Sequence, residues 1–479
     1  MVSVTVNMVS TGRFSERLYS LRAVQNLNGG EMDLSSILVD LIIISLFLVV
    51  GMIIRAKVPI FQRFIIPACV IGGILGLILG TNGLGLIPVT EFYKQLATVA
   101  IDVVFAGLFV GKVIPGLREL GKTAGAQTAY AYFNGFGQIA IGLAVVVVFG
   151  LIGYQLSPLF GLQLLVGYQG GPGVGTAVAP MVGKLGWSAV EAAAIGETCA
   201  IVGLVLAVFI GVIIVNIGTA RDYVVNKYQK KDHKIQSDTF VSQEKRNDIG
   251  KEITSPEAGS SLAFNFGIMG LAILCGHLIH FGIVTAAPPL SFLPKFPFVL
   301  IGGLVVQAIL QRSRLDIYVD SRTIDTISGF ALDTLVVAAL MAINLTVVVA
   351  YAAPLVVMLV CGALFNIWQV KWMGPRILPG AWFEKSVCEF GQSTGSTPQA
   401  MLLLKMMDPR FNTGSAEAFA LKMFFFSPIM FPMVMIIMPL IVSKGALMFL
   451  LIYLGLMALV LLICRLTCWQ NRPSMKWFG

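Results

Sequence analysis

A run of 61 residues without a charged side chain, 123–183, is the feature of this sequence that most constrains its fold. Residues 334–370 and 423–443 also lack Asp, Glu, Lys and Arg. About 20 apolar residues cross the hydrocarbon core of a membrane as a helix, so the longest run holds more than one crossing. The sequence lacks the alternating polarity of a membrane β-barrel, which leaves helices as the way to satisfy backbone hydrogen bonds in lipid. The sequence therefore predicts an all-α polytopic membrane protein.

Eleven apolar segments are predicted as spanning helices, and a polar linker at 218–262 divides them. The predicted spans are 34–54, 64–80, 96–113, 128–151, 190–217, 263–284, 296–311, 326–349, 352–371, 416–441 and 444–464. The predicted division of the chain is a polar N-terminal extension (1–33), a first membrane repeat (34–217), the linker, a second membrane repeat (263–441), and an extra C-terminal helix with a basic tail (442–479).

Two further apolar stretches are interrupted by residues that break helices. Residues 167–184 read GYQGGPGVGTAVAPMVGK, and residues 389–407 contain GQSTGSTP. Glycine and proline disrupt helical hydrogen bonding, and broken backbone is tolerated at membrane depth only inside protein or beside a watery cavity. We therefore expect two re-entrant hairpins, at about 161–184 and 388–407.

The positions of Lys and Arg predict the orientation of the chain. The net charge of +9 comes largely from short loops beside apolar segments, which is a topology signal in a membrane protein. If neither interrupted stretch crosses the membrane, the basic loops 55–63, 112–122, 312–322 and 371–385 share one side with the linker and the tail. That side is predicted to be the cytoplasm, with the N-terminus outside. The first hairpin then enters from outside and the second from the cytoplasm.

The two halves of the chain resemble each other weakly. The segment RFIIPACVIGGILG, from Arg63, aligns with KFPFVLIGGLVV, from Lys295, and the same alignment places Asp102 near Asp333. The two interrupted stretches then also correspond. Constant order and spacing favour inverted repeats of five spans each, as in many secondary transporters. Chance similarity among apolar segments is the alternative.

The candidate binding residues lie at the hairpin tips and at two acids within predicted spans. Helix N-termini attract carboxylates, whereas hydroxyl and carbonyl oxygens suit sodium. A charged residue at the centre of a membrane helix costs about 2.5 to 3.5 kcal/mol, which makes it a candidate for function. The predicted substrate-binding residues are Gly170, Gly171, Gly173, Gly175, Thr176, Ser393, Thr394, Gly395, Ser396, Thr397 and Asp333. The predicted sodium ligands are Asp102, Asp333, Thr176 and Thr397.

Other readings of these polar residues stay open. Each tip could be a polar kink in a packed helix, and both acids could be structural partners of polar groups. Glu197 and Lys422 could pair with each other, contact substrate or serve structure. The amides of Asn134, Gln138, Gln307 and Asn344 are expected to form interhelical hydrogen bonds.

Enzyme motifs do not fit the sequence. The segment GGPGVG follows an apolar helix and lacks the Gly-Lys-Ser/Thr ending of a phosphate-binding loop. The pair His277 and His280 lacks the acid of a zinc protease motif. We expect a transporter with no cofactor and no metal other than sodium.

The paired loops and the two-halves organisation resemble the bacterial sodium/glutamate symporter family over about 34–441. That family has Gly-Gly-His-Gly-Thr in its first loop and Gly-Ala-Thr-Pro-Thr-Ala in its second. The matching residues here are Gly170, Gly171, Gly173, Gly395, Thr397, Pro398 and Ala400. Pro172 stands in place of the histidine, and Ser396 and Gln399 also depart from the pattern.

This resemblance implies sodium-coupled uptake of L-glutamate across a bacterial inner membrane. It also implies a homodimer and alternating access in which a hairpin-bearing core moves. One sodium ion only cancels the net charge of glutamate, so import against an inside-negative potential favours at least two. A sodium-coupled carrier of dicarboxylates or hydroxy acids, and a channel or membrane scaffold, are the alternatives.

Overall fold

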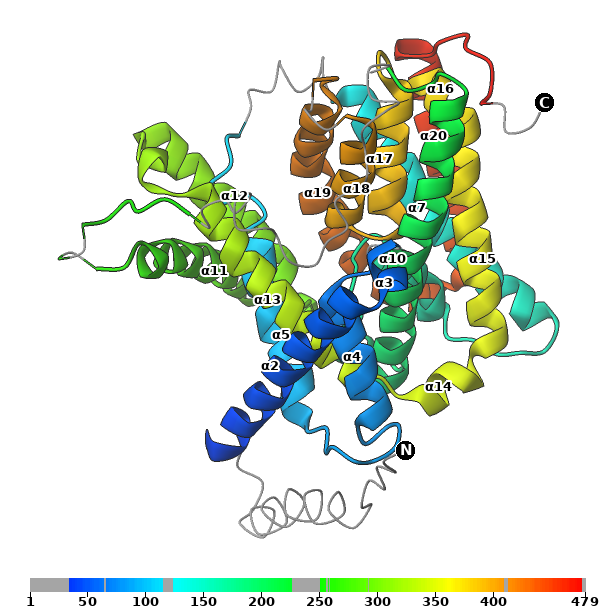
Figure 1. Ribbon diagram of the computed structural model, residues 1–479. Coiled ribbons are helices and arrows are strands. Elements are labelled where there is room, and N and C mark those ends of the chain that lie inside the picture. Colours follow the sequence, from blue (N-terminus) through cyan, green and yellow to red (C-terminus); the bar gives the residue numbers. More distant parts are fainter. Residues whose placement is uncertain are drawn as a thin grey trace, which may run out of the picture.

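The computed structural model describes residues 34–63, 66–114, 124–225, 250–255, 257, 259–291, 293–408 and 412–475. Across these residues the protein is all-helical (Figure 1). The predicted N-terminal extension, most of the linker and the end of the basic tail lie outside the described residues.

Nine helical stretches in the described part of the chain are long and apolar enough to cross a membrane, as expected for a multi-pass protein. They are α2 (Leu34–Lys57), α7 (Gly125–Leu151), α10 (Ala189–Ala220), α11 (Ser261–Ala286), α12 (Phe296–Ser313), α13 (Ser321–Met341), α15 (Ala352–Trp368) with its continuation to Ile377, α19 (Ser415–Lys444) and α20 (Ala446–Thr467). The continuation of α15 is a π-helical turn, Gln369–Met373, followed by α16 (Gly374–Ile377).

Two of the eleven predicted spans form shorter helices. The segment predicted at 64–80 gives α4 (Ala68–Leu79), and the segment predicted at 96–113 gives α5 (Glu91–Ala106). At 1.5 Å per residue these helices are about 18 Å and 24 Å long, short of a hydrocarbon core of about 30 Å. Extended backbone at Pro67 and Gly80 bounds α4, which explains its length.

The predicted continuous helix at 326–349 is wrong. Helix α13 ends at Met341, and α14 (Leu345–Ala350) begins after a break. Asn344 caps α14, because its Oδ1 accepts hydrogen bonds from the backbone N–H groups of Thr346 (3.1 Å) and Val347 (3.3 Å). Asn344 is thus a helix cap and does not show the interhelical bond expected of it.

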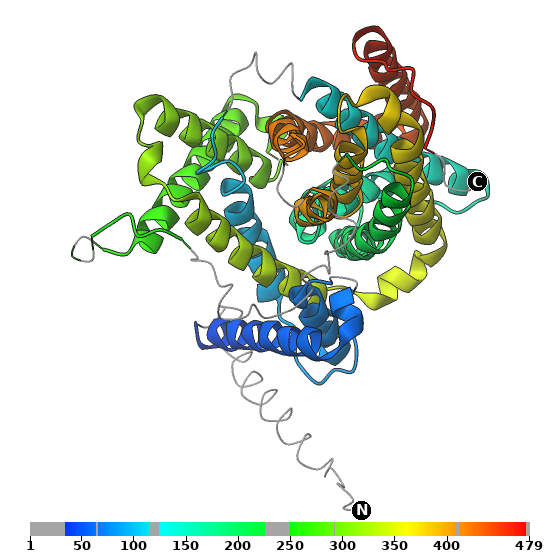
Figure 2. The same cartoon turned by 45° about the horizontal axis from the view of Figure 1, so that its top comes forward.

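The helices form two groups that lie side by side in Figures 1 and 2. The arm group consists of α2, α4, α5, α11, α12 and α13. Close glycine contacts hold it together: a Cβ placed on Gly302 of α12 would lie 2.4 Å from the backbone oxygen of Ala272 in α11. Small residues allow such close backbone approach between membrane helices.

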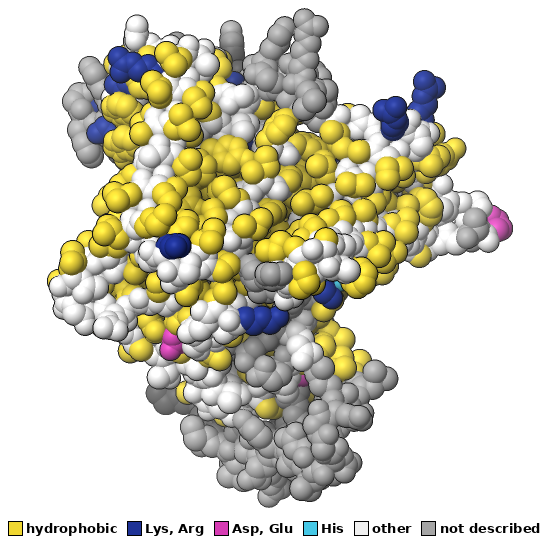
Figure 3. Space-filling view, turned by 180° about the vertical axis from the view of Figure 1, so that it is seen from behind, with side chains coloured by type: hydrophobic (Ala, Val, Ile, Leu, Met, Phe, Trp, Pro, Cys, Tyr) yellow, Lys and Arg dark blue, Asp and Glu magenta, His cyan; other side chains and the backbone are white. Residues whose placement is uncertain are grey.

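The second group, which we call the tip group, contains both interrupted segments. It consists of α7, α8 (Gln163–Tyr168), α9 (Val174–Lys184), α10, α15, α17 (Trp382–Thr394), α18 (Thr397–Met407), α19 and α20. Figure 3 shows apolar side chains over most of the rear face, with Lys and Arg gathered mainly toward its upper edge, which fits a protein surrounded by lipid.

The helix breaks predicted in both interrupted stretches are present. In the first, Gly171 and Gly173 have φ angles of 75° and 90°, a left-handed region that disfavours residues with a Cβ. The first tip, residues 169–173, therefore turns the chain from α8 into α9. The second tip, residues 393–397, joins α17 to α18.

Candidate functional site

The tips of the two interrupted segments meet inside the tip group. A Cβ placed on Gly171 would lie 3.5 Å from the Cβ of Ser396 and 3.8 Å from the backbone oxygen of Gly395. The Gln392 side-chain amide also donates to the backbone oxygen of Gln169, at 3.4 Å. The structure thus brings together the two sets of tip residues that the sequence predicts.

Buried amide side chains from α7 and α15 connect the two tips. Asn366 donates to the hydroxyl of Thr394 (2.9 Å) and to the backbone oxygen of Ser393 (3.2 Å). Asn134 donates to Asn366 and accepts from Gln169, each at 2.8 Å. The first tip is therefore tied to the second through two helices of the same group.

The expectation of interhelical bonds is confirmed for Asn134 and Gln138, since Gln138 donates to the backbone oxygen of Ser393. Gln307 of α12 instead accepts from the backbone N–H of Gly111, which lies in the turn after α5, at 2.8 Å. The sequence reasoning missed Gln169 and Asn366. The signal for Asn366 was an amide in a run of residues without charge.

Glu197 caps the helix that follows the first tip. Its carboxylate accepts hydrogen bonds from the backbone N–H of Gly173 (2.9 and 3.0 Å), and from the backbone N–H and hydroxyl of Thr176 (3.0 Å each). The side chain is buried on α10. The partial positive charge at the start of α9 thus already faces a carboxylate from the protein itself.

Lys422 forms a buried ion pair with Glu389. Lys422 Nζ lies 3.0 Å from Glu389 Oε1, and the second carboxylate oxygen of Glu389 accepts from Gln127 of α7 at 3.0 Å. The ammonium group also lies over the rings of Phe419 and Phe426, at 4.6 and 5.1 Å. Lys422 on α19 therefore pairs with α17, and Glu197 and Lys422 do not pair with each other.

The two acids predicted as sodium ligands lie in the arm group. Asp102 of α5 contacts His277 of α11, with 3.0 Å between Oδ2 and Nε2. Asp333 of α13 lies near the thiol of Cys69 in α4.

The residue of α13 that reaches the first tip is Leu335. A Cβ placed on Gly173 would lie 2.0 Å from its side chain. Residues two apart on a helix point in nearly opposite directions, so Asp333 faces away from that contact.

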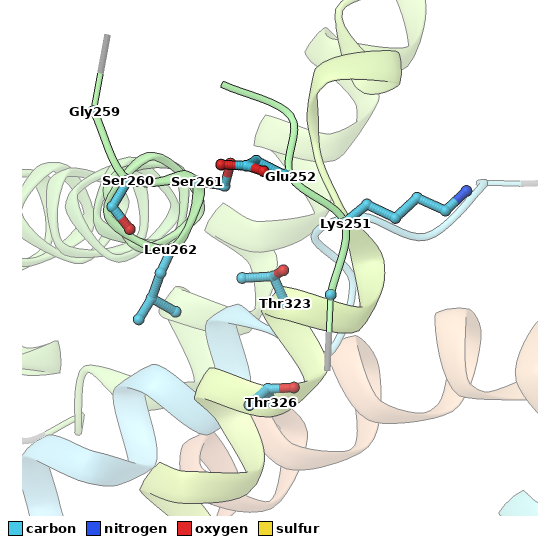
Figure 4. Close-up of a pocket in the computed structure, with 9 residues that line it drawn as sticks. Lys251, Glu252, Gly259, Ser260, Ser261, Leu262, Thr323 and Thr326 are labelled. Atoms are coloured by element: carbon cyan, nitrogen blue, oxygen red, sulfur yellow. The ribbon is translucent and has the colours of Figure 1, made fainter. Parts of the chain in front are cut away.

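A pocket opens at the other end of α13, where the linker returns to the membrane domain (Figure 4). Its lining includes Lys251, Glu252, Ser261, Thr323 and Thr326. Thr326 precedes Leu335 by nine residues, which corresponds to about 13 Å along the helix. This pocket is therefore separate from the place where the tips meet.

Comparison with protein families gave a match over most of the chain. A family model described as sodium/glutamate symporter matches residues 33–413. The chain belongs to this family. Comparison with curated proteins gave no match.

Membership of the sodium/glutamate symporter family identifies the chain as a multi-pass membrane transporter rather than an enzyme, and it implies sodium-coupled symport of glutamate. The match includes both tips of the symporter. It ends at residue 413, short of the predicted limit of 441, so α19 and α20 lie beyond it.

Proposed function

We propose that this symporter imports L-glutamate with sodium by alternating access, and that glutamate binds between the two tips. The observation that carries the proposal is the close approach of Gly171 to Ser396. Residues from both halves of the chain meet there, among buried hydrogen-bonding groups. A ligand that enters between the tips would separate them, and this would link binding to movement of both interrupted segments.

The second tip is the better partner for a carboxylate of glutamate. The N-terminus of α9 already faces Glu197, whereas Ser396 at the start of α18 makes no side-chain capping hydrogen bond. Backbone N–H groups at a helix N-terminus bind anions. We therefore assign the substrate carboxylate to Ser393, Thr394, Gly395, Ser396 and Thr397, and close backbone approach to Gly170, Gly171, Gly173, Gly175 and Thr176.

The division into two groups supports inverted repeats and a moving core. Helices α2, α4 and α5 precede the linker and α11, α12 and α13 follow it, so each half gives three helices to the arm group. Each half also gives one interrupted segment to the tip group. We propose that the tip group moves against the arm group, which forms the homodimer. The basic loops favour a cytoplasmic linker and C-terminus, an outside N-terminus, and re-entrant segments that enter from opposite sides.

Uptake into proteoliposomes tests this function. With an inward sodium gradient, labelled L-glutamate should accumulate above its outside concentration and the rate should saturate. Replacement of sodium by potassium should abolish accumulation. A channel would equilibrate substrate without concentrating it, and a scaffold would show no flux.

The same assay separates glutamate from the alternative substrates. Excess unlabelled malate or citrate should leave glutamate uptake largely unchanged. Sodium-driven uptake of labelled malate or citrate, with no uptake of glutamate, would instead establish a carrier of dicarboxylates or hydroxy acids.

A further inference from the structure

Glu197 differs in its partners from Glu389, another buried acid of the tip group. Glu389 pairs with Lys422, whereas Glu197 receives hydrogen bonds from the neutral groups of Gly173 and Thr176. Among the residues that the structure describes, no cationic side chain lies within ion-pair distance of Glu197. The N-terminus of α9 supplies roughly half an elementary charge, which leaves part of the carboxylate charge unbalanced.

A buried amide without hydrogen-bond partners lies at the same junction of helices. Gln163 of α8 is 1% exposed, and neither its Nε2 nor its Oε1 has a hydrogen-bond partner among the described residues. Its Oε1 lies 2.8 Å from the position that a Cβ on Gly196 would take. Gly196 directly precedes Glu197. A buried amide without partners is unusual in proteins, and a bound water or ion would satisfy it.

Helices α8, α9 and α10 converge at this point. A Cβ placed on Gly175 would lie 3.0 Å from the backbone of both Gly196 and Glu197, so α9 packs directly onto α10 there. Thr176, next to Gly175, directs its hydroxyl at the Glu197 carboxylate at 3.0 Å. The Glu197 carboxylate and the Thr176 hydroxyl are thus in contact at this junction, and the Gln163 amide oxygen lies beside Gly196, the residue before Glu197.

We propose that this junction is a binding site for a coupling sodium ion, with Glu197 as its charged ligand and Thr176 and Gln163 as neutral oxygen ligands. The proposal rests on the proposed function and deepens it by naming the ion site. Oxygen donors suit a hard cation, and the positive ion balances the carboxylate. The Thr176 hydroxyl can turn a lone pair to the ion while its backbone N–H still donates to Glu197.

This position explains how sodium acts on the substrate site. The N–H of Gly173 donates to both oxygens of Glu197, and Gly173 is the last residue of the first tip. A sodium ion bound to the Glu197 carboxylate would change the hydrogen bonds that this carboxylate accepts from Gly173. Sodium binding then shapes the first tip, two residues from the close approach of Gly171 to Ser396, and so promotes glutamate binding.

The test compares Glu197→Gln with Glu191→Gln as a matched control. The Glu197→Gln side chain would keep an oxygen that accepts from Gly173 and Thr176 but lose the charge. Glu191 lies on the same helix, and its carboxylate accepts from Trp187 and Tyr351 near the start of α10. Two quantities are measured: the sodium concentration that half-saturates glutamate uptake, and the rise in unfolding temperature of the purified protein with sodium instead of potassium.

Glu197→Gln should raise the half-saturating sodium concentration by about tenfold or more and reduce the sodium-dependent rise in unfolding temperature. Glu191→Gln should leave both unchanged. A folded Glu197→Gln protein with the wild-type sodium dependence of uptake would overturn the ion site and leave Glu197 as a helix cap only.

Thr176→Val and Gln163→Leu keep the test decisive if Glu197→Gln does not fold. Each variant should raise the sodium concentration that half-saturates glutamate uptake. A wild-type half-saturating concentration in both variants would overturn the proposal. The proposed function fails in a different way, by wild-type glutamate uptake that is indifferent to sodium.

Discussion

Lys422 and Glu389 form an ion pair of 3.0 Å in which both side chains are almost completely buried. A charge left alone in such a place is costly, because the protein interior solvates it poorly. The pair joins α19 to α17 and, through Gln127, to α7. It therefore ties the second interrupted segment to two long helices of the tip group.

Removal of one partner of this pair should destabilise the symporter strongly. We expect Lys422→Met to lower the free energy of unfolding by about 3 to 5 kcal/mol, and the double variant Lys422→Met with Glu389→Gln to recover part of that loss. The exposed pair Lys112 and Asp325, at 3.3 Å, is the control, since Lys112→Met should cost about 1 kcal/mol or less. Thermal unfolding in detergent measures all three. A single variant no less stable than the double variant would contradict this expectation.

Gly173 should tolerate alanine less well than a glycine of similar backbone conformation. Gly173 and Gly153 both have positive φ angles, 90° and 86°. A Cβ on Gly173 would lie 2.0 Å from the Leu335 side chain, whereas a Cβ on Gly153 would have open space. We expect Gly153→Ala to cost about 1 kcal/mol from backbone strain alone. Gly173→Ala should cost more and reduce glutamate uptake. If both variants lower the free energy of unfolding equally, the Leu335 side chain can move to make room for the added Cβ.

Asp102 and Asp333 stay predicted sodium ligands, and Asn variants test them. Each acid lies in a helix of the arm group. A charged side chain at the centre of a membrane helix costs about 2.5 to 3.5 kcal/mol, and a role in sodium binding would explain why the chain keeps it there. We expect Asp102→Asn and Asp333→Asn to lower sodium-driven uptake at fixed sodium concentration. If both variants transport like the wild type, the contacts with His277 and Cys69 account for these acids.

Low pH should weaken the attachment of residues 250–255, at the end of the linker, to Asp320 at the start of α13. Partial burial acts to raise the pKa of Asp320, but hydrogen bonds from Thr323 and Lys251 outweigh it and hold the pKa below its ordinary value. The carboxylate therefore stabilises this attachment above its unfolded pKa of about 3.9, and the stabilisation is lost as pH falls through the lower folded value.

Hydrogen exchange of residues 250–255 at stepwise lower pH measures this release. After correction for the intrinsic pH dependence of exchange, protection should fall below about pH 4 in the wild type. Asp320→Asn keeps a capping oxygen without a titrating group, so its protection should change less with pH. An equal loss of protection with falling pH in the wild type and in Asp320→Asn would show that groups other than Asp320 control the attachment.

Transport should carry net positive charge inward. Each charge that crosses a potential of 100 mV gains or costs about 2.3 kcal/mol, so coupling to two or more sodium ions makes an inside-negative potential favourable. We expect a potassium-valinomycin potential to accelerate glutamate uptake into proteoliposomes. Uptake that is indifferent to the imposed potential would indicate one sodium ion per glutamate.

Much of the fold follows from local sequence chemistry. Long apolar runs predict the spans, and the glycines of the first tip predict its break, because positive φ angles favour glycine. The break after Met341 escaped prediction, since apolar Ala342 and Ile343 continue the pattern and the capping signal of Asn344 is a single side chain.

The partners of the buried charges could not be read in the same way. Sequence shows that Asp102 lies within a helix, but its contact His277 is 175 residues away. Which helix faces a carboxylate depends on packing between distant segments. The same holds for Glu197. The sequence shows that it lies within a predicted helix, but not that it contacts the first tip.

The contact between the two tips also constrains how the protein is made. Gln392 and Gln169, which bond across it, are 223 residues apart. At roughly 5 to 20 residues per second, the ribosome needs roughly 10 to 45 s to supply the second partner. During that interval the first tip lacks its counterpart. Glu197 follows the first tip by only 24 residues, so it can shield the exposed amide of Gly173 while synthesis continues.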